Sequence, residues 1–123
     1  MLRSMMHVYI RDSGQAIKFY QKAFNAELLC SYPDNGEPLS HGELSIYGQV
    51  LALAELSDET AVTGNTMQLC FEFGEGKEAV VQEIYDVLRD EAKIIHHPLG
   101  PIDFSPLLAD LVDKYGVHWC IFV

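Results

Sequence analysis

Positive charge is scarce in this chain of 123 residues. Eight Lys and Arg stand against 18 Asp and Glu, which gives a formal net charge of −10. Nucleic-acid backbones and anionic membrane surfaces attract clusters of basic side chains. We therefore expect no nucleic acid and no membrane among its partners, and a small molecule or another protein instead.

Long apolar runs and paired cysteines are missing too. Runs such as residues 50–54 are far shorter than the roughly 20 residues of a membrane-spanning helix, and no apolar leader follows Met1. Cys30, Cys70 and Cys120 are odd in number and have no CxxC spacing. These features predict a cytoplasmic protein with reduced thiols, without a disulfide framework or a structural zinc site.

Several motifs of known chemistry do not occur. The sequence has no Walker loop, dinucleotide-binding glycine pattern, nucleophile elbow or HExxH. Its Gly74-Glu75-Gly76 segment is too short and too acidic to bind phosphates. We therefore expect no nucleotide chemistry.

The clearest feature present is a strand followed directly by a helix. Met6, Val8 and Ile10 alternate with polar and aromatic residues, as in a strand with one covered face. Apolar residues then recur at three- and four-residue spacing over residues 15–24, which predicts a helix packed on a sheet. Asp12 or Ser13 is its expected N-cap. Strands are predicted over 27–32, 42–47 and 49–55, with a turn at 33–36.

The same order returns about 62 residues later. A strand over 67–73 precedes a helix with the apolar stripe Ala79, Val80, Ile84, Val87 and Leu88. Further strands are predicted over 92–97, 107–113 and 117–123. We therefore predict a single α+β domain of two βαβββ modules, at about 3–56 and 67–123, joined by a connector at about 57–66.

Three sequence segments resemble a known family. They are Ala16-Ile17-Lys18-Phe19-Tyr20 with Phe24, His41-Gly42-Glu43-Leu44, and Asp113-Lys114-Tyr115-Gly116-Val117-His118-Trp119. In this order the chain resembles the vicinal oxygen chelate superfamily, which includes glyoxalase I, bleomycin and fosfomycin resistance proteins and extradiol dioxygenases, and within it the PhnB-like branch. The resemblance implies an incomplete barrel around a pocket, and commonly a homodimer.

The resemblance also implies four inward positions that carry metal ligands in the metalloenzymes. Transferred by spacing, they fall at Met5, Ala52, Gln68 and Cys120. Only Gln68 is a usual ligand type, because Met5 offers a soft thioether and Ala52 has no donor atom. We therefore predict no cofactor and no metal site of the usual family type.

Strand alternation gives ten candidate pocket residues. They are His7, Tyr9, His41, Glu43, Tyr47, Gln68, Cys70, Glu72, His118 and Cys120. Burying an unpaired carboxylate costs several kcal/mol, so Glu43 and Glu72 each require a partner or water.

Other residues have more than one interpretation. His7 is a lining residue, a displaced metal ligand or a general base. His41 with Glu43 begins a solvated strand, forms an acid–base pair or shares a metal with His7. Adjacent strand residues point to opposite faces, so the neighbours His96 and His97 are expected to be a loop or strand-end pair and not a chelate.

The two cysteines of the second module also allow two interpretations. Cys70 and Cys120 are ordinary buried thiols or a facing reactive pair.

Three functions remain open, and the sequence does not decide whether the protein is an enzyme. The first is a metal-free binding protein for a small organic molecule in the inter-module pocket, where inward carboxylates favour a cationic or hydrogen-bond-donating ligand. The second is a divalent-metal lyase, isomerase or dioxygenase with a rearranged set such as His7, His41, Glu43 and Gln68. The third is a homodimeric interaction module.

Overall fold

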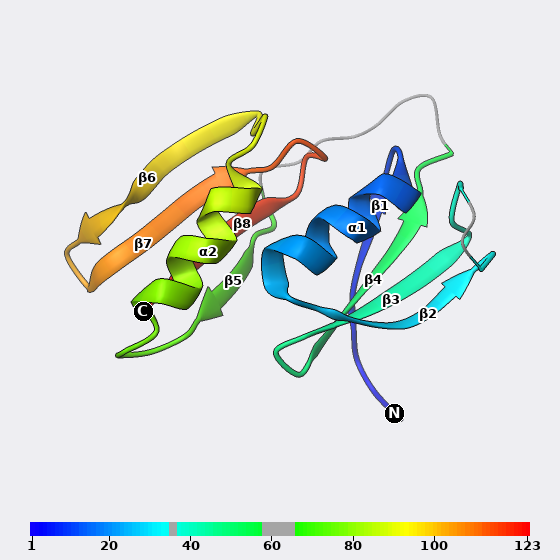
Figure 1. Ribbon diagram of the computed structural model, residues 1–123, viewed down its shortest axis with the longest axis horizontal. Helices are drawn as coiled ribbons and strands as arrows, with labels where there is room; N and C mark the ends of the chain where they lie inside the picture. The colour runs from blue at the N-terminus through cyan, green and yellow to red at the C-terminus, as the bar shows by residue number, and fades with distance from the viewer. Residues whose placement is uncertain (35–36, 58–65) are drawn as a thin grey trace. The chain divides into compact units, whose positions relative to one another are not determined.

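The computed structural model describes residues 1–34, 37–57 and 66–123, and it divides the chain into two compact units, Met1–Ala61 and Val62–Val123 (Figure 1). The division falls within the predicted connector, whose residues 58–65 lie outside the described residues. Asn35 and Gly36 of the predicted turn lie outside them as well. Each unit is considered by itself below.

The first unit has the order β1 (Met6–Ile10), α1 (Ser13–Phe24), β2 (Glu27–Tyr32), β3 (His41–Ile46) and β4 (Gln49–Glu55). Its four strands form one open sheet in the order β1-β4-β3-β2. β1 runs parallel to β4, and the other neighbours are antiparallel. This is the predicted βαβββ module.

The second unit repeats this plan with β5 (Leu69–Glu72), α2 (Glu78–Leu88), β6 (Ile94–Ile102), β7 (Ser105–Val112) and β8 (His118–Phe122). Its sheet has the matching order β5-β8-β7-β6, again with one parallel pair. The α+β fold of two tandem βαβββ modules is thus confirmed. No helix among the described residues is long and apolar enough to cross a membrane.

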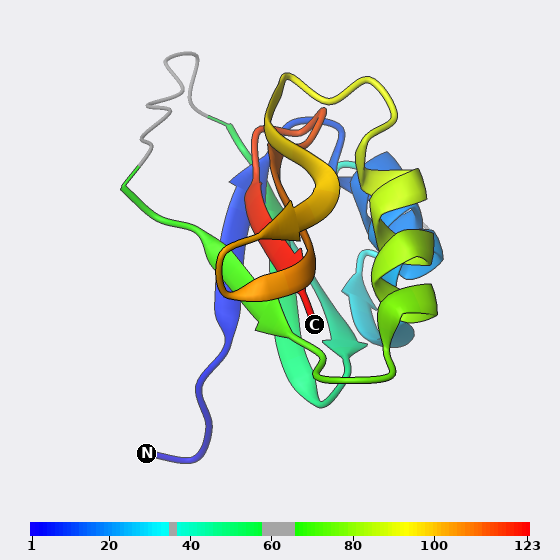
Figure 2. The ribbon, with the colours of Figure 1, turned by 90° about the vertical axis from the view of Figure 1, so that its left-hand side faces the viewer.

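Each sheet packs one face against the helix of its own unit, as Figure 2 shows for α2. In the first unit, Gly42 of β3 faces α1, because a Cβ atom there would lie 2.9 Å from Cδ1 of Ile17. By strand alternation, Leu44 and Ile46 point the same way, and both are fully buried. The residues that alternate with them along β3, His41, Glu43 and Ser45, therefore point to the opposite face.

The predicted N-cap residue of α1 is confirmed by position, but the capping hydrogen bonds come from another strand. Asp12 occupies the N-cap position, but its side chain makes no capping hydrogen bond. Instead, the Glu55 carboxylate at the end of β4 accepts hydrogen bonds from the backbone N–H of Asp12 (3.1 Å) and of Ser13 (3.0 Å). The Ser13 hydroxyl donates to the same carboxylate at 2.8 Å. Helix N-termini leave such donors unpaired and favour negative charge, so Glu55 joins α1 to the sheet.

Several predicted strand bounds need correction. β5 is shorter than the predicted 67–73, and β6 extends to Ile102 instead of ending at 97. β6 contains Pro98 and Pro101, and in a sequence such prolines suggest that a strand is interrupted. β6 is an edge strand, however, and an edge strand tolerates residues that cannot donate a ladder hydrogen bond.

A buried carboxylate organises the last hairpin of the second unit. Asp113 has no exposed surface. Its Oδ1 accepts hydrogen bonds from the backbone N–H of Tyr115 (2.8 Å) and Val117 (3.0 Å), and its Oδ2 accepts one from Nε1 of Trp119 (2.8 Å). The same side chain therefore fixes the turn and the orientation of the fully buried Trp119.

Replacement of Asp113 tests this role. Asp113→Ala leaves three donors without their acceptor, and we expect the free energy of unfolding to fall by about 2–4 kcal/mol. Trp119 is the only tryptophan, so its fluorescence during urea denaturation reports this unit directly. The control Asp103→Ala removes an exposed carboxylate and is expected to change stability by less than about 0.5 kcal/mol. Equal stability of the two variants would contradict the assigned role.

Candidate functional site

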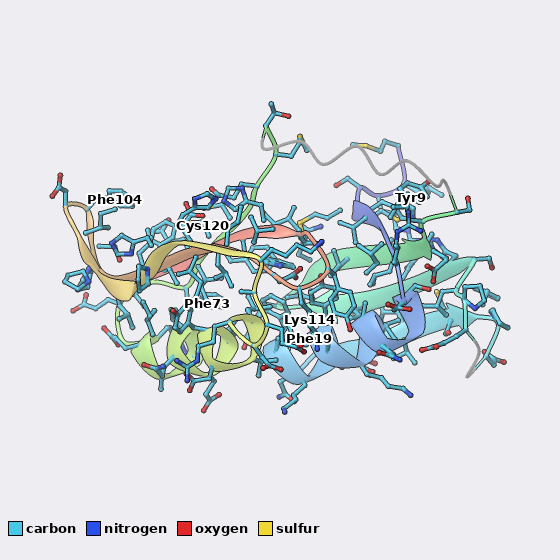
Figure 3. All side chains as sticks on the ribbon, turned by 90° about the horizontal axis from the view of Figure 1, so that it is seen from above. Tyr9, Phe19, Phe73, Phe104, Lys114 and Cys120 are labelled. Atoms are coloured by element: carbon cyan, nitrogen blue, oxygen red, sulfur yellow. The ribbon has the colours of Figure 1, made fainter. Side chains whose placement is uncertain are left out.

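The face of the first sheet opposite α1 carries one row of residues from all four strands. His7 of β1 pairs with Ala52 of β4, Ala52 pairs with Glu43 of β3, and Glu43 pairs with Cys30 of β2. Paired residues in a sheet point to the same side. The row therefore brings a ring, a carboxylate and a thiol to one face, and Figure 3 shows Tyr9 on this side of the sheet, away from α1.

Glu43 is the buried centre of this face. Its side chain is 7% exposed, and its two oxygens accept hydrogen bonds from Nη1 and Nη2 of Arg3 at 2.7 and 2.8 Å. Nε2 of His41 lies 2.8 Å from Oε1 of the same carboxylate. The hydrogen bonds from Arg3 and His41 lower the pKa of Glu43 to about 2, although burial opposes this shift. The carboxylate has the partners that its burial requires.

Aromatic rings extend this cluster toward β1. The His7 ring stacks on the His41 ring with centroids 5.7 Å apart, and Tyr9 meets His7 edge-on at 4.6 Å. Burial, and then the neighbouring His41, lower the pKa of His7. His7 and Tyr9 are exposed, and Arg3 keeps 52% of its side chain exposed. The face thus combines a fixed guanidinium with accessible rings.

Tyr47 does not belong to this strand face. It follows β3 and has a φ of 49°, and Gly48 after it has a φ of 86°. Two central residues with positive φ are typical of the type I′ turn in a two-residue hairpin. The predicted strand therefore ends one residue early, and Tyr47 lies in the turn.

The second sheet carries a row at the equivalent register. Cys70 of β5 pairs with Cys120 of β8, Cys120 pairs with Asp110 of β7, and Asp110 pairs with His97 of β6. Cys120 is buried, and Figure 3 shows it on the side of its sheet away from α2. Burial, and then the neighbouring Cys70, raise the pKa of Cys120 to about 12. Cys70 is exposed, so the expectation of two buried thiols is wrong for this residue.

Glu72, at the end of β5, needs no protein partner. Its side chain is exposed, so water satisfies the carboxylate.

A polar cluster surrounds His118 in the same unit. Nε2 of His118 lies 2.6 Å from Oδ1 of Asp110 and 3.0 Å from Nε2 of Gln68. The His96 ring lies 5.2 Å from the His118 ring, measured between centroids. Nδ1 of His118 is buried and has no hydrogen-bond partner among the described residues.

The interpretation of His96 and His97 needs correction. Both lie within β6 and not in a loop or at a strand end. The ring of His96 approaches His118, whereas Nδ1 of His97 lies 3.2 Å from the carbonyl oxygen of Leu108.

Sequence reasoning missed two residues of these clusters. Arg3 precedes the first strand, where no pattern assigns its side chain a partner 40 residues away. Asp110 had a signal, because it is a single carboxylate in the otherwise apolar run 107–112.

The residues at the four transferred family positions do not fit a metal ion. Ala52 lies between His7 and Glu43 in the register and offers no donor. Cys120 holds its proton strongly because it is buried, and Met5 offers only a thioether. The rearranged set His7, His41, Glu43 and Gln68 meets a further obstacle, because Arg3 already occupies both oxygens of Glu43.

Solved structures share this architecture across almost the whole chain. Protein PA1353 from Pseudomonas aeruginosa aligns with a TM-score of 0.79 and 16% identity over 99% of this chain and 97% of its own. The PhnB protein from Bacillus cereus aligns with a TM-score of 0.77 and 22% identity over 98% of both chains. The fosfomycin resistance protein FosX from Listeria monocytogenes aligns with a TM-score of 0.68 and 18% identity over 98% of this chain and 91% of its own.

These likenesses define the class of fold. The chain has the paired βαβββ fold of the vicinal oxygen chelate proteins, and its structural neighbours include a PhnB protein. The resemblance found in the sequence is thus confirmed at the level of fold. No family model and no curated protein matches the sequence.

The low pKa of Glu43 predicts a pH dependence of stability. In the folded chain the pKa is about 2, below its ordinary value of 4.5. The stabilisation from this carboxylate is therefore present above pH 4.5 and is lost as the pH falls from about 4.5 to about 2. We expect Glu43→Gln to have a smaller loss of unfolding free energy across this range in urea denaturation.

The matched control is Glu72→Gln, which removes an exposed carboxylate. It is expected to keep the pH dependence of the unchanged chain. An equally steep pH dependence in Glu43→Gln would show that Glu43 does not produce it.

Proposed function

We propose that this protein binds a small organic molecule with a planar ring and a hydrogen-bond-accepting group, on the face of its first sheet opposite α1. The observation that carries the proposal is the ring cluster of the exposed His7 and Tyr9 and the half-buried His41, beside the half-exposed Arg3. A planar molecule can stack on the rings while its acceptor group meets the guanidinium.

The buried carboxylate supports this proposal by holding the site in place. Glu43 binds Arg3 through two hydrogen bonds and His41 through a third. Side chains fixed before binding lose less conformational entropy when the ligand arrives, which favours affinity. Because Arg3 and His41 occupy the carboxylate, Glu43 does not supply the free negative charge expected for a cationic ligand.

The name of one structural neighbour refers to a small molecule. FosX from Listeria monocytogenes is named a fosfomycin resistance protein. At 18% identity this likeness carries the fold alone, so the ligand chemistry proposed for this chain rests on its own residues. The proposed binding requires neither a metal nor catalysis.

A comparison of three probes tests the proposal. We expect salicylate, which has a ring and a carboxylate, to move the NMR resonances of His7 and Tyr9 and to raise the melting temperature. Benzamidine carries a cation that the Arg3 guanidinium repels, and cyclohexanecarboxylate lacks the planar ring, so both are expected to bind at least about tenfold more weakly.

Two tyrosines of similar exposure provide matched variants. Tyr9 is 62% exposed and contacts His7, whereas Tyr47 is 58% exposed and lies in the turn. We expect Tyr9→Ala and Arg3→Ala to weaken salicylate binding at least about tenfold and Tyr47→Ala to leave it within about twofold. Salicylate that moves no resonance of His7 or Tyr9 at millimolar concentration would refute the proposed site.

We also propose a homodimer, and the edge strand β2 supports it. Leu28 and Leu29 are each 45% exposed, and Tyr32 is 60% exposed. Exposed apolar side chains on an edge strand gain from being covered by another chain.

Sedimentation tests the dimer. We expect a dimer at micromolar concentration and a shift toward monomer for Leu29→Lys, because a charge on the edge opposes pairing of strands. The control Met67→Lys adds a charge at another exposed apolar residue and is expected to remain dimeric. A monomeric unchanged chain would refute the dimer.

The proposed location is the cytoplasm. The free cysteines Cys30, Cys70 and Cys120 support a reducing compartment.

A further inference from the structure

Three side chains with metal-ligating atoms meet on adjacent strands of the second sheet. His96 lies on β6, Asp110 on β7 and His118 on β8, and one potential ligand atom of each lies within 4.8 Å of the other two. Ligands about 2.0–2.1 Å from a zinc ion at tetrahedral angles stand roughly 3.4 Å apart. Small side-chain rotations would therefore bring all three atoms to one ion.

A β-bulge explains how His96 reaches this cluster. Ile95 pairs with Leu111 and His97 pairs with Asp110, so β6 advances by two residues while β7 advances by one. His96 is the extra residue. A bulge interrupts strand alternation and redirects a side chain, and bulges are frequent beside functional sites. Strand alternation therefore does not keep His96 from the face that carries Asp110 and His118.

The contacts of His118 do not satisfy its ring. Nε2 faces an acceptor, Oδ1 of Asp110 at 2.6 Å, and a donor, Nε2 of Gln68 at 3.0 Å. One ring nitrogen either donates or accepts, so it cannot serve both contacts. A cation that binds both Nε2 and the Asp110 carboxylate takes the place of a proton between them, and the exposed Gln68 amide can then turn to water.

We propose that His96, Asp110 and His118 bind one divalent transition-metal ion, of which Zn²⁺ is the reference. Two imidazoles and one carboxylate suit zinc, iron, cobalt or nickel, whereas calcium and magnesium prefer oxygen ligands alone. None of the three residues lies at the transferred positions Met5, Ala52, Gln68 and Cys120. The site is thus separate from the ligand pattern that the fold suggests, and it goes beyond the binding function proposed for the first sheet.

A second group of metal-ligating side chains provides an internal comparison. Cys30, His41 and Glu43 in the first unit also have ligand atoms within 4.8 Å of one another. There, Arg3 binds both oxygens of Glu43, so an incoming cation has to displace a guanidinium. Among the described contacts, Asp110 instead pairs with the ring of His118, which can be neutral, unlike a guanidinium. We therefore assign the metal site to the second unit.

Metal titration of the full chain tests the site. The protein is stripped with a chelator and titrated calorimetrically with Zn²⁺, and visible absorption is recorded with Co²⁺. We expect one equivalent to bind with a Kd at or below about 10 μM. The cobalt spectrum is expected to show four- or five-coordinate nitrogen and oxygen ligation without the intense near-ultraviolet band of a thiolate ligand, which excludes Cys70 and Cys120.

Variants identify the ligands. His96→Ala and Asp110→Asn are each expected to weaken Zn²⁺ binding at least about tenfold. His97→Ala replaces the adjacent histidine, and Glu43→Gln alters the comparison group, and both are expected to stay within about twofold. Circular dichroism and Trp119 fluorescence confirm folding, and the exposed His96 keeps the test valid if Asp110→Asn does not fold.

Three outcomes would overturn the proposal. The first is the absence of saturable Zn²⁺ binding below about 100 μM. The second is undiminished affinity in His96→Ala, and the third is a loss in Glu43→Gln that matches or exceeds the loss in His96→Ala.

Discussion

The one-sided covering of each sheet is the constraint on which the rest of this structure depends. One helix packs on one face of four strands, so alternation sends every second residue to the other face. On that face, Glu43 of β3 and Asp110 of β7 hold equivalent register positions. Glu43 pairs with Ala52, which pairs with His7 of β1, and Asp110 pairs with Cys120, which pairs with Cys70 of β5. The duplicated fold thus repeats a carboxylate in both halves.

The two carboxylates differ in how the chain satisfies them. Glu43 receives a bidentate guanidinium and an imidazole, which neutralise it and leave fixed donors and rings exposed. Asp110 receives the His118 imidazole beside a bulge that supplies a second histidine. The same backbone plan therefore produces exposed rings beside a guanidinium in one unit, where we propose an organic ligand, and a set of metal-ligating atoms in the other. This divergence agrees with the general rule that sites, and not folds, carry function.

Much of the fold could be predicted from local patterns. Periods of two and of three to four residues located nearly every strand and both helices, because each element shows its buried face in its own sequence. The errors fall where another effect acts. Tyr47 lies outside β3 because the hairpin turn needs two residues with positive φ. β6 continues through its prolines because it lies at an edge. Glu55, at the end of β4, accepts the hydrogen bonds that a local side chain was expected to accept at the start of α1.

The sequence by itself determined the order of elements, the duplication and which residues of a strand share a face, since these follow from spacing along the chain. Only the tertiary structure decided which side chains become hydrogen-bond partners. Arg3 and Glu43 are 40 residues apart, and Gln68 and His118 are 50 apart. Such partners depend on the register between distant strands and on the bulge at His96, and both are set when the strands pair, not by the local sequence.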